Sequence, residues 1–391
     1  MTLLVIVYFP RIFRKTGTAC QCDTMSEKQK NKKNDVIAED SGPVFRILDA
    51  AINRASEGLR VVEDFARMIL EDVFLSRQLK NLRHDLIDSC RSLNSKSRLT
   101  ARDSQADVGR DVQVDSEYQR EDLESIVRAN MTRVQQATRT IEEYSKVLFP
   151  AVTKQVEQIR YRAYTVEKAV FNSAFNKKRF ADAHLYVLVD ACGESSGFEK
   201  LKSLVSALVA AEVDLIQLRD KRLSDQELIA AGQLIADLTA KSKTMFVIND
   251  RADLCVAAGA DGVHLGQSDL SVHQARMLLR PNQFIGVSTH SLDQARQAVI
   301  DGADYIGVGP VFESQTKSFD SHVGVKLVSQ VAGEVSLPAF AIGGIDASNV
   351  GSVVEAGCCR VAVSSAICGA ADPEMAAVDL LGKLRLAKSE A

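Results

Sequence analysis

Residues 245–250 read MFVIND, four apolar residues followed directly by an asparagine and an aspartate. A run that contains phenylalanine, valine and isoleucine favours a pleated, enclosed strand. A carboxylate at the end of such a strand needs water, a cation or a hydrogen-bonding partner. Asp250 therefore indicates a strand end that faces a charged or polar group.

The same pattern recurs through the second half of the chain. Short apolar runs alternate with segments of helical periodicity from residue 184 onward, which predicts parallel strands joined by helices. The predicted strands are 185–190, 213–219, 245–250, 262–266, 284–288, 305–309, 338–342 and 360–364. Eight strands, each followed by a helix, predict a (β/α)8 TIM barrel. An open doubly wound sheet is the alternative, disfavoured because no Gly-x-Gly-x-x-Gly turn follows the first strand.

The first half of the chain has helical spacing and almost no strand signal. Residues 53–67, NRASEGLRVVEDFAR, match residues 132–146, TRVQQATRTIEEYSK, as a weak internal repeat. In residues 53–67 an apolar flank opposes a polar flank that includes Glu63. Two interpretations stay open: two related helices packed as a pair with their charged faces close together, or two solvated faces crossed by ion pairs. The charge pattern alone favours the second.

Length and composition set the domain organisation. A chain of 391 residues exceeds one ordinary core. We predict a polar, disordered lead-in over 1–41, an all-α helical domain over 42–177 and the barrel over 178–391. The opening run MTLLVIVYF is too short to span a bilayer and is followed, not preceded, by basic residues, so translation starting at Met25 is as plausible as at Met1.

Charge and cysteine usage restrict partners and location. The formal net charge of -3 and pI of about 6.1 argue against general nucleic-acid or membrane binding. The eight cysteines form no Cys-x-x-Cys pair and no Cys/His cluster with zinc spacing, which favours reduced thiols in the cytoplasm. We expect small-molecule partners, and the sequence leaves a homo-oligomer open.

Polar side chains gather at the carboxyl ends of the predicted strands, where barrel enzymes carry their chemistry. Each of them alone is compatible with a turn or a helix cap. The set is Gln217, Arg219, Lys221, Asn249, Asp250, Gln267, Asp269, Ser288, His290, Ser314, Thr316, Lys317, Gly343, Gly344, Ser364 and Ser365.

Together these residues describe one cation site and two anion sites. Asp250 and Asp269 follow adjacent strands and suit one hard divalent ion. Three basic residues suit a diphosphate, namely Arg219, Lys221 and Lys317. The glycine and serine pairs after strands seven and eight suit a phosphomonoester. The expected chemistry is a substitution in which diphosphate leaves with the help of Mg²⁺ and a phosphorylated nucleophile takes its place. His264 lies within a predicted strand, and we expect it beside the core.

The motifs of the second half resemble those of the thiamine phosphate synthases. They are QLRDK (217–221), VINDR (247–251), GVHLGQSD (262–269), GVSTHS (286–291), DYIGVGPVF (304–312) with Thr316 and Lys317, AIGGI (341–345) and VSSAI (363–367). That family couples hydroxymethylpyrimidine diphosphate to a thiazole phosphate through a carbocation-like pyrimidine.

The resemblance implies roles for the strand-end residues. Asp250 and Asp269 would hold Mg²⁺. The pyrimidine diphosphate would meet Gln217, Arg219, Lys221, Asn249, Ser288 and Lys317, of which Lys221, Asn249, Ser288 and Lys317 would act in catalysis. The thiazole phosphate would meet Ser314, Thr316, Gly343, Gly344, Ser364 and Ser365. Ser314 stands where the family usually has threonine, and Ser364 where it usually has an apolar residue.

The helical half resembles a small all-helical family found fused ahead of such synthases and implicated as a hydroxymethylpyrimidine phosphate kinase. The motifs are RILDAAINRASEGLRVVEDFAR (46–67), RHDL (83–86) and RDSQADVGRDV (102–112). This resemblance implies ATP as a co-substrate, with phosphate contacts from Arg54, Arg60, Arg133 and Arg139. No glycine-rich phosphate loop marks an ATP site.

Two other functions compete with a synthase. A thiazole tautomerase-like barrel would lack the metal and diphosphate residues, whereas Asp250, Asp269, Lys221 and Lys317 are all present. A non-catalytic sensor would bind a thiamine precursor in the barrel and a partner on the helices, and would not turn over the two substrates.

Overall fold

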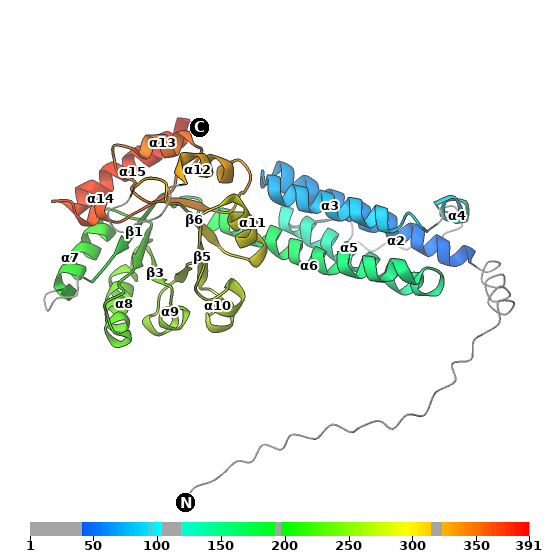
Figure 1. Ribbon diagram of the computed structural model, residues 1–391, viewed down its shortest axis with the longest axis horizontal. Coiled ribbons are helices and arrows are strands. Elements are labelled where there is room, and N and C mark those ends of the chain that lie inside the picture. The colour runs from blue at the N-terminus through cyan, green and yellow to red at the C-terminus, as the bar shows by residue number, and fades with distance from the viewer. Residues whose placement is uncertain (1–40, 94, 104–118, 192–196, 314–322, 391) are drawn as a thin grey trace, which may run out of the picture.

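The computed structural model describes residues 41–93, 95–103, 119–191, 197–313 and 323–390. It has a helical bundle at one end and a barrel at the other (Figure 1). The predicted disordered lead-in over 1–41 lies outside the described residues, apart from Ser41. The predicted site residues Ser314, Thr316 and Lys317 also lie outside them. Among the described residues, no helix has both the length and the apolar character needed to cross a membrane.

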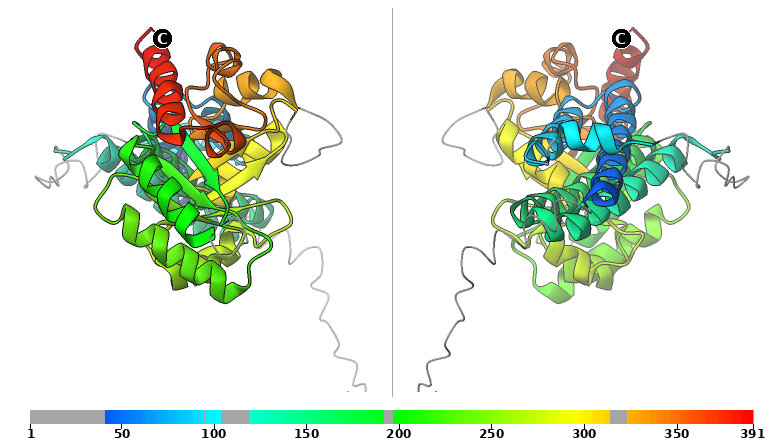
Figure 2. Two further views of the ribbon diagram at one scale, coloured as in Figure 1. Left: turned by 90° about the vertical axis from the view of Figure 1, so that its left-hand side faces the viewer. Right: turned by 90° about the vertical axis from the view of Figure 1, so that its right-hand side faces the viewer.

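Within the described residues, four long helices and one short one form the bundle. They are α2 (Gly42–Met68), α3 (Val73–Ser89), α4 (Ser95–Ala101), α5 (Leu123–Leu148) and α6 (Pro150–Arg179). Asp72 caps α3 and Asp122 caps α5, each accepting a hydrogen bond from a backbone N–H in the first turn. Figure 2 shows the bundle end on, with α2 and α4 toward the viewer in its right-hand view.

The two repeat helices pack against each other, which the first interpretation of the repeat predicts, while their charged residues form ion pairs along each helix, which the second predicts. At Gly58 of α2, a Cβ atom would lie 2.8 Å from Cγ2 of Val134 on α5. A larger residue at position 58 would separate the helices, so the glycine sets their close approach. The paired packing of the repeat is confirmed.

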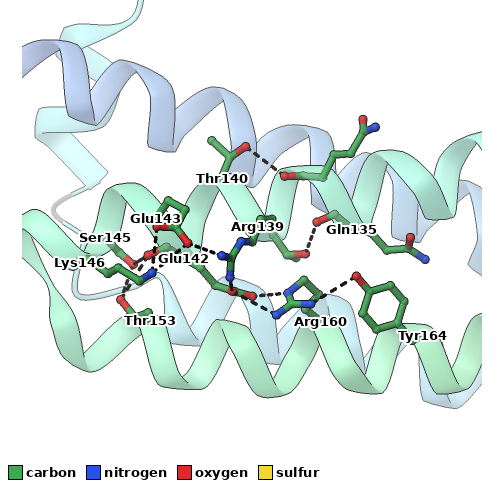
Figure 3. Close-up of polar contacts among 12 residues, drawn as sticks. Gln135, Arg139, Thr140, Glu142, Glu143, Ser145, Lys146, Thr153, Arg160 and Tyr164 are labelled. Carbon is green, nitrogen blue, oxygen red and sulfur yellow. Dashed lines mark hydrogen bonds and ion pairs between the residues drawn. The ribbon is translucent and has the colours of Figure 1, made fainter.

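The placement of Glu63 on a solvated flank was wrong. Its side chain is buried, because Arg83 of α3 reaches back and places Nη2 3.1 Å from Oε2 of Glu63. The repeat partner Glu142 is buried in the same way, with Nε of Arg160 on α6 2.5 Å from Oε1 of Glu142 (Figure 3). Each pair joins the two helices of one hairpin, and loss of one partner would leave a buried charge unpaired.

The second half is a closed parallel barrel in which β1 to β8 pair in sequence order and β8 pairs with β1. The strands are β1 (Leu185–Val189), β2 (Leu215–Leu218), β3 (Met245–Asn249), β4 (Gly262–Leu265), β5 (Phe284–Thr289), β6 (Tyr305–Val308), β7 (Ala339–Ile342) and β8 (Val361–Val363). Each predicted strand is present, so the TIM-barrel prediction is confirmed.

Nine helices follow the strands and cover the barrel among the described residues. They are α7 (Gly197–Ala210), α8 (Asp225–Thr239), α9 (Ala252–Ala258), α10 (Val272–Leu278), α11 (Leu292–Asp301), α12 (Gly324–Ala332), α13 (Val350–Glu355), α14 (Ser365–Cys368) and α15 (Pro373–Glu390). Their capping follows ordinary rules: Ser224 of α8 and Ser271 of α10 each form a capping box.

Aromatic rings fill the interior of the barrel. Phe180, directly after α6, packs with Phe284, Tyr305 and Phe340, at centroid distances of 5.4, 5.6 and 6.4 Å. Gly286 makes room for this cluster, since a Cβ there would lie 2.0 Å from Cζ of Tyr305. Phe180 is fully buried, so the chain that enters from the bundle also closes the barrel floor.

The bundle docks on the N-terminal ends of the barrel strands. Asn176 of α6 donates to Asp304, which precedes β6, at 2.9 Å. Asp72 accepts from the backbone N–H and the hydroxyl of Ser336, before β7, both at 2.9 Å. Burial raises the pKa of Asp72 despite these hydrogen bonds. The carboxyl ends of the strands therefore face away from the bundle. The predicted domain boundary at residues 177 and 178 falls in the last turn of α6.

Candidate active site at the barrel mouth

A cavity of about 470 Å³ opens at the carboxyl ends of the strands. It is lined by every predicted barrel-site residue that the structure describes: Gln217, Arg219, Lys221, Asn249, Asp250, Asp269, Ser288, Gly343, Gly344, Ser364 and Ser365. Parallel strands deliver these side chains from distant sequence positions to one place. Their individual roles stay predictions.

Two carboxylates converge on one side of this cavity. Asp250 follows β3 and Asp269 follows β4, and these strands pair directly. Burial, with added hydrogen-bonding and charge repulsion from Asp269, raises the pKa of Asp250. Lys221 and Arg219 oppose this rise, with Lys221 Nζ 3.8 Å from an Asp250 carboxylate oxygen.

The donor set fits a hard divalent ion that keeps other oxygen ligands. Two adjacent carboxylates that destabilise each other's charge gain most from a cation between them. Among the described residues, no three His, Cys, Asp or Glu side chains gather as a metal cage. Mg²⁺ commonly binds through one or two carboxylates plus substrate oxygens, so two aspartates suffice.

The backbone at Asp250 has an uncommon conformation. Its φ is 63°, in the left-handed region that favours glycine and that asparagine and aspartate tolerate best among other residues. Its N–H donates to the carbonyl of His264 on β4 at 2.7 Å. The turn brings the carboxylate toward the loop after β4, where Asp269 accepts from the Gly266 N–H at 2.6 Å.

Backbone turns line the opposite side of the cavity. Gly343 and Gly344 follow β7 with φ of 105° and 62°. A Cβ at Gly344 would lie 2.2 Å from the carbonyl oxygen of Glu313, so the loops after β6 and β7 are in close contact. Ser364 and Ser365 begin α14 beside them. This side presents glycines and hydroxyls instead of carboxylates.

Two family models match separate parts of the chain. The model described as thiamine monophosphate synthase matches residues 185–367, and the model described as the ThiD2 family matches residues 46–169. A thiamine-phosphate synthase from Rhodopirellula baltica is 43% identical over 337 residues, covering 84% of this chain and 89% of that protein. The chain belongs to the thiamine-phosphate synthase family.

Further relatives carry the same description. A thiamine-phosphate synthase from Synechocystis is 38% identical and covers 87% of this chain and 96% of that protein. A solved structure of thiamine phosphate pyrophosphorylase from Pyrococcus furiosus is 30% identical, with a TM-score of 0.46, and covers 52% of this chain and 96% of that chain. The two synthases from Rhodopirellula baltica and Synechocystis match both halves of this chain, and the protein is a transferase of thiamine biosynthesis.

The four arginines predicted in the helical domain of this thiamine-phosphate synthase differ in their surroundings. Arg60 contacts Glu63 and Asp64, and Arg139 contacts Glu142 and Glu143 in the same way. Arg54 and Arg133 are exposed, and neither forms an ion pair with another residue within the described ranges. Arg133 donates to Oδ1 of Asn130 at 3.5 Å, and this second pair differs from the first in having no carboxylate partner among the described residues.

Two site residues of the synthase barrel escaped the sequence prediction. Tyr186 of β1 and His264 of β4 line the floor of the cavity. His264 was expected beside the core, and it is buried, but both its ring nitrogens have partners. The signal in the sequence was one side chain with a polar ring at an inward-facing position of β1 and one at such a position of β4. A packed core residue would give the same pattern.

The buried imidazole predicts acid sensitivity of the fold. Burial lowers the pKa of His264 from 6.5 to about 4. As the pH falls through 6.5, the imidazole of His264 takes up a proton in the unfolded chain, whereas in the native chain it stays neutral down to about pH 4. We therefore expect the free energy of unfolding to fall between these values by up to about 3 kcal/mol. Urea melts at successive pH values measure this slope. His264→Gln removes the titration, and an equal slope in that variant would contradict the assignment.

Proposed function

We propose that the cavity divides into a diphosphate side and a phosphomonoester side, and that the helical domain supplies the diphosphate substrate. One observation carries the barrel part: the carboxylate pair of Asp250 and Asp269 lies with Arg219 and Lys221 in one cavity, while glycines and serines line its other side. The side with carboxylates and basic residues suits a metal-bound diphosphate, and the side with glycines and serines suits a phosphomonoester.

The diphosphate side takes hydroxymethylpyrimidine diphosphate. Arg219 and Lys221 contact its phosphate oxygens, and Lys317 joins them by its place in the motif after β6. Asp250 and Asp269 hold Mg²⁺, which when bound supplies charge neutralisation for the leaving diphosphate. Gln217, Asn249 and Ser288 orient the pyrimidine ring.

The phosphomonoester side takes thiazole phosphate. Gly343, Gly344, Ser364 and Ser365 offer backbone N–H and hydroxyl donors to its phosphate, together with Ser314 and Thr316. The bond between the pyrimidine methylene carbon and the diphosphate oxygen breaks, and the thiazole nitrogen forms the new carbon–nitrogen bond. The protein contributes orientation and charge stabilisation, so no covalent nucleophile is needed.

The helical domain phosphorylates hydroxymethylpyrimidine phosphate with ATP in this proposal. The match to the ThiD2 family supports a separate role for residues 46–169. Arg54 and Arg133 are the phosphate contacts that the surroundings favour, because Arg60 and Arg139 are held in ion pairs. The docked geometry puts this domain at the end of the barrel opposite the mouth, so the diphosphate product crosses through solvent. All substrates are small molecules, and the free thiols of Cys90 and Cys255 suit the cytoplasm.

One experiment tests both halves in the full chain. With pyrimidine monophosphate, ATP, Mg²⁺ and thiazole phosphate, we expect thiamine phosphate to form. Without ATP we expect none, and added pyrimidine diphosphate should restore it. Arg54→Gln should lower the ATP-dependent rate at least about tenfold, the effect of losing one charge-assisted phosphate contact. Chromatography of the thiamine products measures both rates.

The controls separate the two activities. Arg67→Gln changes another exposed arginine of α2 and should leave both rates unchanged. If the protein uses the pyrimidine diphosphate but not the monophosphate, the proposed kinase activity is wrong and the synthase activity stands. Failure to use either would contradict the residue roles given to the barrel.

A further inference from the structure

A continuous chain of hydrogen bonds crosses the barrel interior beneath the cavity. Gln217 donates its side-chain N–H to the hydroxyl of Tyr186. The hydroxyls of Tyr186 and Tyr305 are 2.9 Å apart. Tyr305 is 2.9 Å from Nδ1 of His264, and Nε2 of His264 is 2.9 Å from Oγ of Ser288. The chain links β2, β1, β6, β4 and β5, and its two ends are both proposed pyrimidine contacts.

The interior is built around these rings. Tyr186 and Gln217 are each 2% exposed, and Tyr305 is fully buried. Gly286 admits the Tyr305 ring, and at Gly307 a Cβ would lie 3.3 Å from Cε1 of His264. A buried hydroxyl proton without an acceptor costs about 1–3 kcal/mol, so the direction of the protons along the chain is determined by which arrangement satisfies all of them.

With the amide nitrogen of Gln217 against the Tyr186 hydroxyl, only one direction satisfies every donor. If Ser288 donated to Nε2 of His264, then Nδ1–H would donate to Tyr305 and Tyr305 would donate to Tyr186. The hydroxyl proton of Tyr186 would then find no acceptor in the chain, because Gln217 also donates to it. In the opposite direction Tyr186 donates to Tyr305, Tyr305 donates to Nδ1, and Nε2–H donates to Ser288. The penalty of about 1–3 kcal/mol favours this arrangement roughly tenfold to a hundredfold.

We propose that His264 is a positioning residue, held by Tyr305 as the Nε2–H tautomer so that Ser288 accepts from the imidazole and turns its own hydroxyl proton into the cavity. Ser288 then offers its hydroxyl proton to the cavity, which favours a substrate with an unprotonated acceptor nitrogen or oxygen at that point. This inference rests on the proposed placement of the pyrimidine ring, whose ring nitrogens are such acceptors. It extends the site by Tyr186 and Tyr305, neither of which needs to contact substrate.

The tautomer can be measured without any substrate. Heteronuclear NMR of the full chain with nitrogen-labelled histidine distinguishes the two tautomers, and His264→Gln identifies the His264 signals. We expect the Nε2–H form in the wild type. Tyr305→Phe removes the donor to Nδ1, and we expect a mixture of tautomers. Tyr186→Phe removes an equivalent buried hydroxyl but keeps Tyr305 as donor, so we expect the wild-type tautomer.

The kinetic readout separates positioning from stability. Tyr305→Phe should raise KM for the pyrimidine diphosphate about twofold, because a mixture of tautomers halves the fraction of protein that is competent to bind, and leave KM for thiazole phosphate unchanged. If this variant folds poorly, His264→Gln and His264→Asn replace it. Glutamine keeps a donor near the Nε2 position and asparagine does not, so only asparagine should raise that KM about tenfold.

Several results would overturn the inference. An Nδ1–H tautomer in the wild type, or an unchanged tautomer in Tyr305→Phe, would remove the directional chain. The expected tautomers with an unchanged KM for the pyrimidine diphosphate would remove the positioning role. None of these results touches the turnover and ATP dependence that test the proposed function, so the two failures are distinguishable.

Discussion

We expect Asp250→Asn to lower kcat for thiamine phosphate formation by about a thousandfold and to change the melting temperature little. The expected loss is that of one preorganised electrostatic contact to a leaving group. Asparagine has the same shape and tolerates the left-handed φ of 63° at this position. It lacks the charge that, with Asp269, makes the pair suitable for a divalent ion. The loss would therefore report on the carboxylate and not on the turn after β3.

The measurement is steady-state turnover over a range of Mg²⁺ concentrations, with thermal melts of the same samples. Asp253→Asn is the matched control, because Asp253 begins α9 three residues later and pairs with Arg251 at 2.7 Å on the surface. Its kcat should stay at the wild-type value. Asp250→Ala is a poorer probe, since alanine at a positive φ adds backbone strain of about 1 kcal/mol or more. Wild-type kcat in Asp250→Asn would remove this residue from the metal site.

The sequence predicts the barrel because each signal that defines it is local. An apolar run such as residues 245–248 encodes its own strand, and the polar residue that follows marks the carboxyl end. Since parallel strands all end at one rim, eight local signals also predict which side chains share the cavity. The sequence groups Asp250 and Asp269 in this way, and β3 pairs with β4 in the structure.

The remaining features depend on partners that are distant in sequence. Glu63 reads as a surface residue because Arg83, its partner, belongs to the next helix. Tyr186 and His264 read as core residues, because their hydrogen bonds depend on Tyr305 and on the space left by Gly286. Periodicity reports which face of an element is apolar, and it does not report which buried polar group meets another.

The docking of the bundle is also a long-range feature. Asp72 and Ser336 are separated by most of the barrel sequence, yet the carboxylate of Asp72 caps α3 and accepts two hydrogen bonds from Ser336. Asp72 caps α3 locally, and nothing in the neighbouring sequence marks its contact with Ser336. Its second role appears only in the folded chain, where Ser336, which precedes β7, lies beside the start of α3.

We expect Phe180→Ala to lower the free energy of unfolding of the barrel by about 3–5 kcal/mol, the range for removing a large aromatic ring from a core. Phe180 is fully buried and packs edge to face against Phe284, with ring planes at 89°. Its removal leaves a cavity that neighbouring strands cannot fill without breaking the barrel ladder. Chemical denaturation monitored by circular dichroism measures the change.

Phe175→Ala is the matched control, because Phe175 lies on the same helix and is 60% exposed. We expect a change within about 0.5 kcal/mol for that surface substitution. A change below about 1 kcal/mol in Phe180→Ala would contradict the role of Phe180 as the barrel floor. If the large loss is found, the segment that ends α6 is part of the barrel core, since the ring that closes the barrel is attached to the helix that docks the bundle. The two halves would then share a structural element even though their proposed chemistry is separate, which is a physical reason for them to remain on one chain.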